Sequence, residues 1–422
     1  MKNRLNRRDF FKFLGFSTAA FIMTPSLLKA VSTPHIVVVG GGFAGSTCAK
    51  YLKMWGGSSI QVTIIEPNQT YVSPILSNLV LNGQKTIADI SFNYLAHAQK
   101  YQVSMLHKKV DSINKTNKEL TLNDNSTISY DYLVLAPGID FIPASGHTNY
   151  TKVPHAWISG EQTTTLKNQI ELMVDGDNFL MSIPKAPYRC PPGPYERACV
   201  VADYIKNVKG FRNSKVVVLD ENSKIIVEEP TFSSAFSSYG VNYIPNATVT
   251  AVDDSINQVT YNISGGSNIL ETAKVLNIIP NQKAAKIVFD SGLNIGNWAS
   301  VDAISYESTI QNGIFIIGDS QGTSQPKAGH IGNSEAKICA DAILRKINNL
   351  DLYANPKTNS ACYSPVSRTQ ASWLTAVYEY DSTTKNMKVV SGANYPASGP
   401  ASTKNYSNMF EWSTNLFADT FK

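Results

Sequence analysis

The chain has 422 residues, of which 43% are hydrophobic and 10% aromatic, enough for two to three globular domains with large cores. Its formal net charge of +5 arises entirely within the first 30 residues, and the remaining residues have equal numbers of basic and acidic side chains. The basic pI is therefore no indication of nucleic-acid binding. Five cysteines, with no C-x-x-C pair and no cysteine/histidine cluster, exclude a disulfide scaffold, a haem attachment on this chain and a metal site.

Residues 1–30 have the features of an export signal. The pair Arg7-Arg8 precedes an apolar run, residues 13–23, which is too short to span a bilayer. Ala30 ends a suitable cleavage site. We therefore predict a twin-arginine signal peptide and a periplasmic mature protein with no integral membrane segment. A membrane anchor that stays attached is the alternative.

The first segment after the signal is typical of a dinucleotide-binding site. Residues 35–39 predict a strand, residues 43–54 a helix, and residues 60–65 a second strand that ends in Glu66. The acid at this position can accept a hydrogen bond from a ribose hydroxyl. An ordinary strand-turn-helix unit is the alternative.

Glycines occupy the turn between the first strand and the helix. Gly40 permits a tight turn, Gly42 lets the backbone approach a pyrophosphate, and Gly45 lets the helix pack closely on the strand. Phe43 and Ala44 begin the helix, where free N–H groups and the helix dipole favour phosphate.

Two later segments complete the predicted FAD site. A strand at residues 130–135 ends in a tight turn, and the strand at residues 314–317 leads through Gly318-Asp319 to a helix at residues 333–347. Asp319 can accept hydrogen bonds from ribityl hydroxyls, and the helix N-terminus can face the pyrimidine end of a flavin. The predicted cofactor-binding residues are Gly40, Gly42, Phe43, Ala44, Gly45, Glu66, Ser77, Ala136, Gly138, Gly318, Asp319 and Lys327.

A second Rossmann-like unit is predicted after residue 151, but its nucleotide turn is missing. Strands at residues 178–183 and 215–219 follow a helix at residues 161–174. Residues 184–194 between the strands are rich in proline and contain a single glycine. Because close backbone approach and free N–H groups are lost there, we predict no nicotinamide nucleotide site.

Cys190 lies in this proline-rich stretch, just before a predicted helix that runs to about Val208. Since it precedes a proline, we expect an extended conformation. The helix N-terminus, together with Arg189 and Arg197, is expected to favour its thiolate. An inert cysteine in a rigid surface loop is the alternative.

The remaining predictions concern antiparallel elements. Residues 103–113 and 119–122 predict antiparallel strands, and residues 350–422 predict a hairpin around 381–385 followed by a helix. Aromatic residues near one face of that helix favour a core or interface over membrane contact; they are Tyr406, Phe410, Phe417 and Phe421.

The expected fold is therefore α/β, with two Rossmann-like dinucleotide-binding domains. The FAD domain is discontinuous, comprising residues 31–150 and 281–348. Residues 151–280 form the second Rossmann-like domain, which carries the cysteine loop and has no nicotinamide site. Residues 349–422 form a small α+β C-terminal interface domain.

Several motifs together resemble the flavoprotein subunit of flavocytochrome c sulfide dehydrogenase over essentially the whole mature chain. They are the glycine turn, Tyr-Arg-Cys-Pro-Pro-Gly-Pro-Tyr-Glu-Arg at 188–197, Gly-Asp at 318–319 with Pro-Lys at 326–327, and Asn-Ser-Ala-Cys-Tyr at 359–363. The resemblance implies a redox-active disulfide between Cys190 and Cys362 over the flavin. It also implies a separate c-type cytochrome subunit that holds the haem. The family's covalent form attaches flavin to a cysteine where this chain has Pro74, so we expect non-covalent FAD.

The implied reaction begins with attack of hydrosulfide on the Cys190–Cys362 disulfide, which gives a persulfide and a thiolate that reduces the flavin. Glu196 is a candidate proton acceptor, with a solvated helix cap as the alternative. The substrate is then a small inorganic sulfur compound. A sulfide:quinone oxidoreductase is one alternative function, although the poorly basic C-terminus does not favour it. A non-enzymatic FAD-binding partner of a cytochrome is the other.

Overall fold

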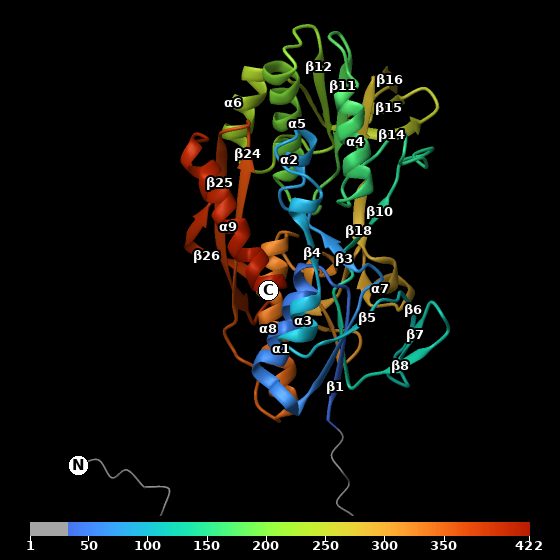
Figure 1. Ribbon diagram of the computed structural model, residues 1–422, viewed down its shortest axis with the longest axis vertical. Helices are drawn as coiled ribbons and strands as arrows, with labels where there is room; N and C mark the ends of the chain where they lie inside the picture. Colours follow the sequence, from blue (N-terminus) through green and yellow to red (C-terminus); the bar gives the residue numbers. More distant parts are fainter. Residues whose placement is uncertain (1–32) are drawn as a thin grey trace, which may run out of the picture. The chain divides into compact units, whose positions relative to one another are not determined.

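The computed structural model describes residues 33–422, and Figure 1 shows how their helices and strands are arranged. The predicted signal peptide lies outside the described residues. Parallel sheets covered by helices form two Rossmann-like domains, followed by a small antiparallel unit. The predicted α/β fold class is confirmed.

The first domain is built on a seven-stranded sheet with the order β21-β22-β23-β9-β1-β2-β5. Strands β23, β9, β1, β2 and β5 are parallel, and β22 and β21 add an antiparallel edge. The sheet therefore combines the first part of the chain with a segment that follows the second domain. Its strands are β1 (His35–Val39), β2 (Gln61–Ile65), β5 (Ser104–Leu106), β9 (Tyr132–Leu135), β21 (Val301–Asp302), β22 (Glu307–Ser308) and β23 (Ile314–Ile316).

Alternate residues of β1 enter two different hydrophobic cores. Ile36 and Val38 pack against helices α1 (Phe43–Gly56) and α8 (Gly329–Ile347), and the valines between them pack on the other face. Because neighbouring side chains of a strand point to opposite faces, a fully apolar strand requires both faces to be covered. This burial places Gly40 at the carboxyl edge of the sheet, where open α/β folds bind ligands.

An antiparallel meander covers the second face of this sheet. It consists of β6 (Val110–Asn114), β7 (Glu119–Leu122) and β8 (Thr127–Ser129). The prediction of antiparallel strands over residues 103–113 was wrong in its first part, because β5 pairs in parallel with β2. Helix α3 (Leu95–Gln99) lies in the crossover before β5, which returns the chain in the same direction.

The second domain has a four-stranded parallel sheet with the order β13-β12-β11-β17. Three helices pack on one face, and strands β14 and β15 cover the other, with β16 paired antiparallel to β15 at the edge. The π-helical turn Tyr204–Val208 extends α5 to the predicted end. The elements are α4 (Glu161–Glu171), β11 (Asn178–Ile183), α5 (Gly193–Asp203), β12 (Lys215–Asp220), α6 (Glu229–Tyr239), β13 (Asn242–Pro245), β14 (Ala247–Asp253), β15 (Gln258–Ile263), β16 (Ile269–Thr272) and β17 (Val275–Ile278).

The C-terminal unit is a three-stranded antiparallel sheet followed by one long helix. The strands are β24 (Lys357–Pro365), β25 (Ala371–Asp381) and β26 (Asn386–Tyr395), and the helix is α9 (Thr403–Phe421). Phe417 and Phe421 of α9 are buried against the glycine turn. The predicted terminal helix and hairpin are present, and the aromatic face of the helix belongs to the core.

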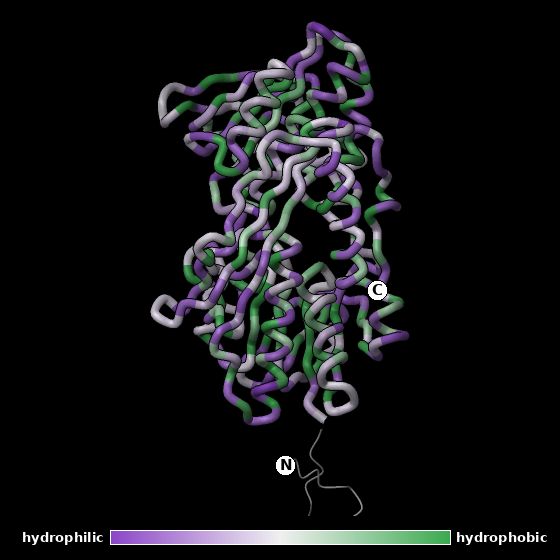
Figure 2. The backbone as a smooth tube through the Cα atoms, turned by 90° about the vertical axis from the view of Figure 1, so that its left-hand side faces the viewer, coloured by the Kyte–Doolittle hydropathy of each residue, from purple (hydrophilic) through white to green (hydrophobic). Residues whose placement is uncertain are grey.

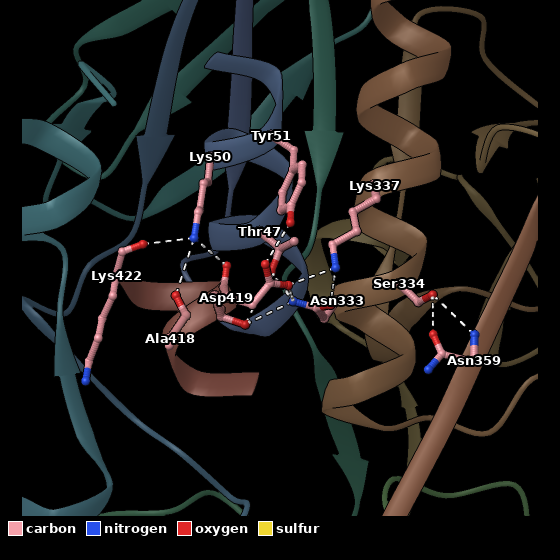
Figure 3. A network of polar contacts seen from close by, with 11 residues as sticks. Thr47, Lys50, Tyr51, Asn333, Ser334, Lys337, Asn359, Ala418, Asp419 and Lys422 are labelled. Carbon is pink, nitrogen blue, oxygen red and sulfur yellow. Dashed lines mark hydrogen bonds and ion pairs between the residues drawn. The ribbon is translucent and has the colours of Figure 1, made fainter. Parts of the chain in front are cut away.

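A polar network fixes the end of α9 to α1 and α8 (Figure 3). The Lys50 ammonium donates to the carbonyl oxygens of Asp419 and Lys422, each at 2.8 Å. Asp419 also forms an ion pair of 2.8 Å with Lys337. A lysine that donates to the last carbonyl oxygens of a helix also complements the helix dipole. Polar contacts therefore add to packing in holding the C-terminal end of α9 against α1 and α8.

Helix α8 begins at Gly329, earlier than the predicted residue 333. Its glycines permit close packing, since a Cβ at Gly329 would lie 2.7 Å from the Phe43 ring and one at Gly332 would lie 3.3 Å from the Ala44 side chain. Figure 2 shows hydrophobic and hydrophilic stretches alternating along the backbone of both domains. Within residues 33–422 we find no helix that has both the length and the apolarity to cross a bilayer.

The remaining elements are short connections. They are η2 (Gly57–Ser59), β3 (Thr70–Val72), α2 (Asn78–Leu81), η3 (Ala88–Ile90), β4 (Ser91–Asn93), β10 (Ile139–Ile142), β18 (Asn281–Ala284), α7 (Lys286–Asp290), β19 (Asn294–Ile295), β20 (Trp298–Ala299) and η5 (Gly318–Ser320). Strands β10 and β18 pair antiparallel where the chain passes between the two Rossmann-like domains.

Candidate active site

A cavity of about 680 Å³ lies at the carboxyl ends of β1, β9 and β23. The cysteine loop of the second domain, strand β24 and helix α9 complete its wall. A volume of this size suits a large organic cofactor, and the position is the one where open α/β sheets bind ligands. Three separate regions of the chain therefore meet at one site.

The glycine turn has the close contacts that a dinucleotide site requires. Gly40 has φ of +101°, and a Cβ there would lie 2.3 Å from the Ala136 carbonyl oxygen. A Cβ at Gly45 would lie 1.9 Å from the Gly40 carbonyl oxygen. The Glu66 carboxylate accepts a hydrogen bond of 2.9 Å from the backbone N–H of Gly41, which fixes the acid beside the turn. These residues fit the pyrophosphate and ribose of FAD.

Most of the predicted cofactor-binding residues line the cavity. Gly45 lies beneath the turn, in agreement with its predicted packing role. Lys327 is different: its ammonium donates to the Gln321 carbonyl oxygen at 2.5 Å and lies 3.6 Å from the Trp298 ring centroid. Lys327 is not among the residues that line the cavity, and its predicted role in cofactor binding stays a prediction. The residues that line the cavity are Gly40, Gly42, Phe43, Ala44, Glu66, Ser77, Ala136, Gly138, Gly318 and Asp319.

The cysteine loop is held by backbone hydrogen bonds to the FAD domain. The N–H of Cys190 donates to the Lys327 carbonyl oxygen at 2.7 Å, and its own carbonyl accepts from Gly193 at 2.9 Å. Cys190 has φ of +57°, so the predicted extended conformation was wrong. The steric effect of the following proline excludes right-handed helix, but the two hydrogen bonds select a left-handed turn. A Cβ at Gly193 would lie 2.9 Å from the Cys190 sulfur, so glycine leaves room for the thiol.

Cys190 and Cys362 both line the cavity and are free thiols in the structure. The predicted disulfide between them therefore stays a prediction. Burial raises the pKa of Cys190 well above its ordinary value, and the nearby Cys362 adds to this. The expectation that the loop favours its thiolate was wrong. Arg189 lowers this pKa only in part, and its guanidinium lies 3.9 Å from the Asp319 carboxylate.

Arg197, the second expected cation, is bound elsewhere. Its guanidinium is 1% exposed and donates to the carbonyl oxygens of His155 at 2.9 Å and Ala156 at 2.8 Å. It also lies 4.8 Å from the centroid of the Trp157 ring. A cation that is already saturated by carbonyls and an aromatic face does little for a neighbouring thiolate.

Glu196 lies in the cavity wall, and its carboxyl is held by Asn78. The Asn78 amide donates to Glu196 Oε1 at 2.9 Å, and its oxygen accepts from Arg197 Nε at 2.9 Å. Burial raises the pKa of Glu196 to about 8, although the Asn78 hydrogen bond lowers it in part. At 9% exposure the side chain is not a solvated helix cap. A carboxyl with this pKa can take up and release a proton near neutral pH.

Asp220 occupies the position of the ribose-binding acid in the second domain, but other side chains of the protein cover its carboxylate. Asp220 ends β12, and it is fully buried. The phenol groups of Tyr195 and Tyr243 each donate to its Oδ2 at 2.8 Å. This arrangement supports the predicted loss of nicotinamide binding, because the carboxylate has no free lone pair directed at a ribose.

Three family profiles match the chain. The profile of the central part of the sulfide dehydrogenase (flavocytochrome c) flavoprotein chain matches residues 163–280, and the flavocytochrome c sulphide dehydrogenase flavin-binding profile matches residues 354–421. A pyridine nucleotide-disulphide oxidoreductase profile matches residues 34–176. The chain belongs to the flavocytochrome c sulfide dehydrogenase flavoprotein family. The two specific profiles contain Cys190 and Cys362 respectively.

Curated relatives of this flavoprotein include sulfide-quinone reductase of Aquifex aeolicus, 24% identical over 78% of this chain and 80% of the relative. The mitochondrial sulfide:quinone oxidoreductase of Schizosaccharomyces pombe is 23% identical over 82% and 80%. The solved sulfide:quinone oxidoreductase of Aquifex aeolicus has a TM-score of 0.76 with 16% identity, over 92% of both chains. These likenesses agree with the Rossmann-like fold of the flavoprotein.

Sequence reasoning missed some residues of the flavoprotein's cavity. Trp157 and Trp412 line it, yet neither lies in a motif. Asn78 directly follows the predicted Ser77, but the sequence analysis assigned it no role. Asn78 binds both Glu196 and Arg197, which follow it by more than a hundred residues in the sequence. A local sequence pattern cannot reveal such a contact.

Proposed function

We propose that the protein is an FAD-dependent sulfide dehydrogenase flavoprotein that oxidises hydrosulfide and passes electrons to a c-type cytochrome subunit. The observation that carries this proposal is the meeting of Cys190, Cys362 and the glycine turn in one cavity. The family profiles support sulfide as the substrate class and FAD as the cofactor. The twin-arginine pattern of the first 30 residues supports a periplasmic location.

The cavity residues fit FAD held without a covalent bond. Gly40 and Gly42 provide the turn for the pyrophosphate, Asp319 can hold the ribityl hydroxyls, and Pro74 stands in the wall without a nucleophilic atom. When bound, FAD accepts an electron pair from a thiol donor and releases the electrons singly. A proline side chain cannot form a thioether, which is the chemical basis for the non-covalent assignment.

The chain's own part in the reaction is thiol chemistry. The sulfur of hydrosulfide bonds to one cysteine of the Cys190–Cys362 disulfide, the S–S bond breaks, and its electron pair remains on the other sulfur as a thiolate. The new persulfide carries the proton of hydrosulfide. Glu196 accepts that proton, and Asn78 keeps its carboxyl directed into the cavity.

Quinone is the alternative electron acceptor, because the curated relatives are named for it. The packing of α9 favours the cytochrome instead. Phe417 and Phe421 are buried against Phe43 in the glycine turn, so this aromatic face is not available to a lipid surface.

The test is anaerobic mixing of the FAD-loaded protein with sulfide while the flavin absorbance is recorded. We expect sulfide to bleach the flavin and NADH to leave it oxidised over minutes. The reduced protein should then reduce a c-type cytochrome faster than a soluble quinone. Bleaching by NADH but not by sulfide would instead indicate a pyridine-nucleotide reductase. Faster reduction of quinone than of cytochrome would support sulfide oxidation but contradict the cytochrome as electron acceptor.

A further inference from the structure

Glu228 is a buried carboxyl that the proposed reaction does not use. It immediately precedes α6, has φ of +50° and is 3% exposed. Ser364 donates to its Oε2 and Ser372 to its Oε1, each at 2.6 Å. A carboxyl held by two hydroxyl groups in a backbone conformation unusual for glutamate is a built feature of the fold.

The two serines place this carboxyl beside Cys362. Ser364 on β24 and Ser372 on β25 are direct partners in the antiparallel ladder, so one carboxyl bridges the pair. Cys362 precedes Ser364 by two residues on a strand without a bulge, and therefore points to the same face. Figure 1 shows α6 next to this end of β24. Because Ser364 binds its carboxyl, Glu228 lies next to the strand face to which Cys362 points.

The groups around Glu228 are negative or neutral. They are Cys362 on β24, Glu196 and Cys199 on α5, and the neighbouring Glu229, which is exposed and pairs with Lys224 at 3.6 Å. In the described part of the chain no ion pair to Glu228 itself is formed. Burial raises its pKa to about 7, and the two serine hydrogen bonds limit that rise. Burial also raises the pKa of Cys362 to about 12, with Glu228 as the largest charge contribution.

We propose that Glu228 is a positioning residue for Cys362, whose charge decides whether this sulfur can carry a thiolate. The catalytic meaning of this role rests on the proposed function. When hydrosulfide bonds to Cys190, the electron pair of the broken S–S bond stays on Cys362. A thiolate and a carboxylate would then face each other in a buried region, so the proton already on Glu228 is retained there while the thiolate forms.

The test measures the reactivity of Cys362 without sulfide. In the FAD-loaded Cys190→Ser protein, the rate of Cys362 alkylation by iodoacetamide is followed across pH by peptide mass spectrometry. The same measurement is made after adding Glu228→Gln. We expect equal rates below the pKa of Glu228, and about tenfold faster alkylation of the glutamine variant above it, equivalent to one pKa unit. The ratio of the two rates should therefore rise as pH passes through about 7.

Asp220→Asn is the matched control. Asp220 is also a buried carboxyl that accepts from two side-chain hydroxyls, but it belongs to the closed nucleotide position of the second domain. Its substitution should leave the alkylation profile of Cys362 unchanged. If Glu228→Gln changes the rate by the same factor at every pH, Glu228 acts only through structure and the proposal is overturned.

Ser372→Ala provides a second variant that keeps the carboxyl. Removing a hydrogen bond from the ionised form raises the pKa of Glu228, so the inflection in the alkylation profile should move to higher pH. An unmoved inflection would also overturn the proposal. Both readouts are independent of the substrate: failure of sulfide to bleach the flavin would overturn the proposed function and leave the alkylation result intact.

Discussion

The two Rossmann-like domains share a strand-turn-helix plan but use the turn in opposite ways. Between β1 and α1, glycines leave space at the start of the helix. Between β11 and α5, a proline-rich loop fills that space and carries Cys190. Glu66 and Asp220 end equivalent second strands, yet one lines the cavity and the other is closed by two phenols. The comparison shows that the same strand-turn-helix position can hold a glycine turn in one domain and a cysteine loop in the other.

The largest effect is expected from the cysteines themselves. Cys190→Ser or Cys362→Ser should leave FAD bound and abolish flavin reduction by sulfide, because the proposed reaction begins with attack of hydrosulfide on a Cys190–Cys362 disulfide. Anaerobic stopped-flow absorbance measures this. Cys199→Ser is the control, since Cys199 is fully buried in α5 away from the cavity wall, and its activity should stay within a few-fold of wild type. A Cys362→Ser protein that is still reduced by sulfide at the normal rate would show that the pair is structural.

A glycine-to-alanine pair compares the two turns directly. At Gly45 the added Cβ meets a backbone oxygen at 1.9 Å, which cannot move without disturbing β1. We expect Gly45→Ala to lose FAD and about 2–4 kcal/mol of unfolding free energy, measured by flavin retention and denaturant titration. At Gly193 the Cβ meets the Cys190 sulfur at 2.9 Å, a side-chain atom that can shift. Gly193→Ala should therefore keep FAD and slow the reaction with sulfide; the reverse pattern would contradict our assignment of the turns.

Glu196 gives a pH-dependent effect. Its pKa is raised from an ordinary value of 4.5 to about 8 in the folded state, so the native protein binds a proton that the unfolded chain releases. The stability from this group is present below the ordinary pKa and is lost as pH rises through about 8. Glu196→Gln should remove that decline in thermal denaturation curves. It should also slow sulfide-dependent flavin reduction most above pH of about 8, where wild-type Glu196 is ionised and able to accept a proton. Parallel curves at all pH values would argue against a proton-accepting role.

The smallest effect concerns the flavin linkage. With Pro74 in the cavity wall, acid precipitation should release the yellow cofactor into the supernatant without any change in activity before precipitation. Colour that stays with the washed pellet would mean that a different side chain is bonded to the flavin.

The amino-acid sequence was enough to predict the glycine turn, the strand-helix alternation and the cysteine loop motif. These features are local: a buried β-branched strand, a turn that only glycine fits, and a proline-rich loop are each specified within a few residues. They were sufficient for the fold class and for Cys190 as a candidate, whereas Cys362 became a candidate only through the family resemblance. The boundaries of α8 and the direction of β5 were missed because they depend on what packs against them.

The electrostatics of the site depend on the folded structure. The motif alone indicated that Arg189 and Arg197 would favour a Cys190 thiolate, but folding commits Arg197 to carbonyl oxygens and buries the sulfur. The Lys327 ammonium likewise binds a carbonyl oxygen of the protein, that of Gln321. Glu228 is held near Cys362 by serines of β24 and β25, which follow it by more than a hundred residues in the sequence. The physical reason is that desolvation and hydrogen-bond partners depend on the whole fold, whereas turn geometry depends on neighbouring residues.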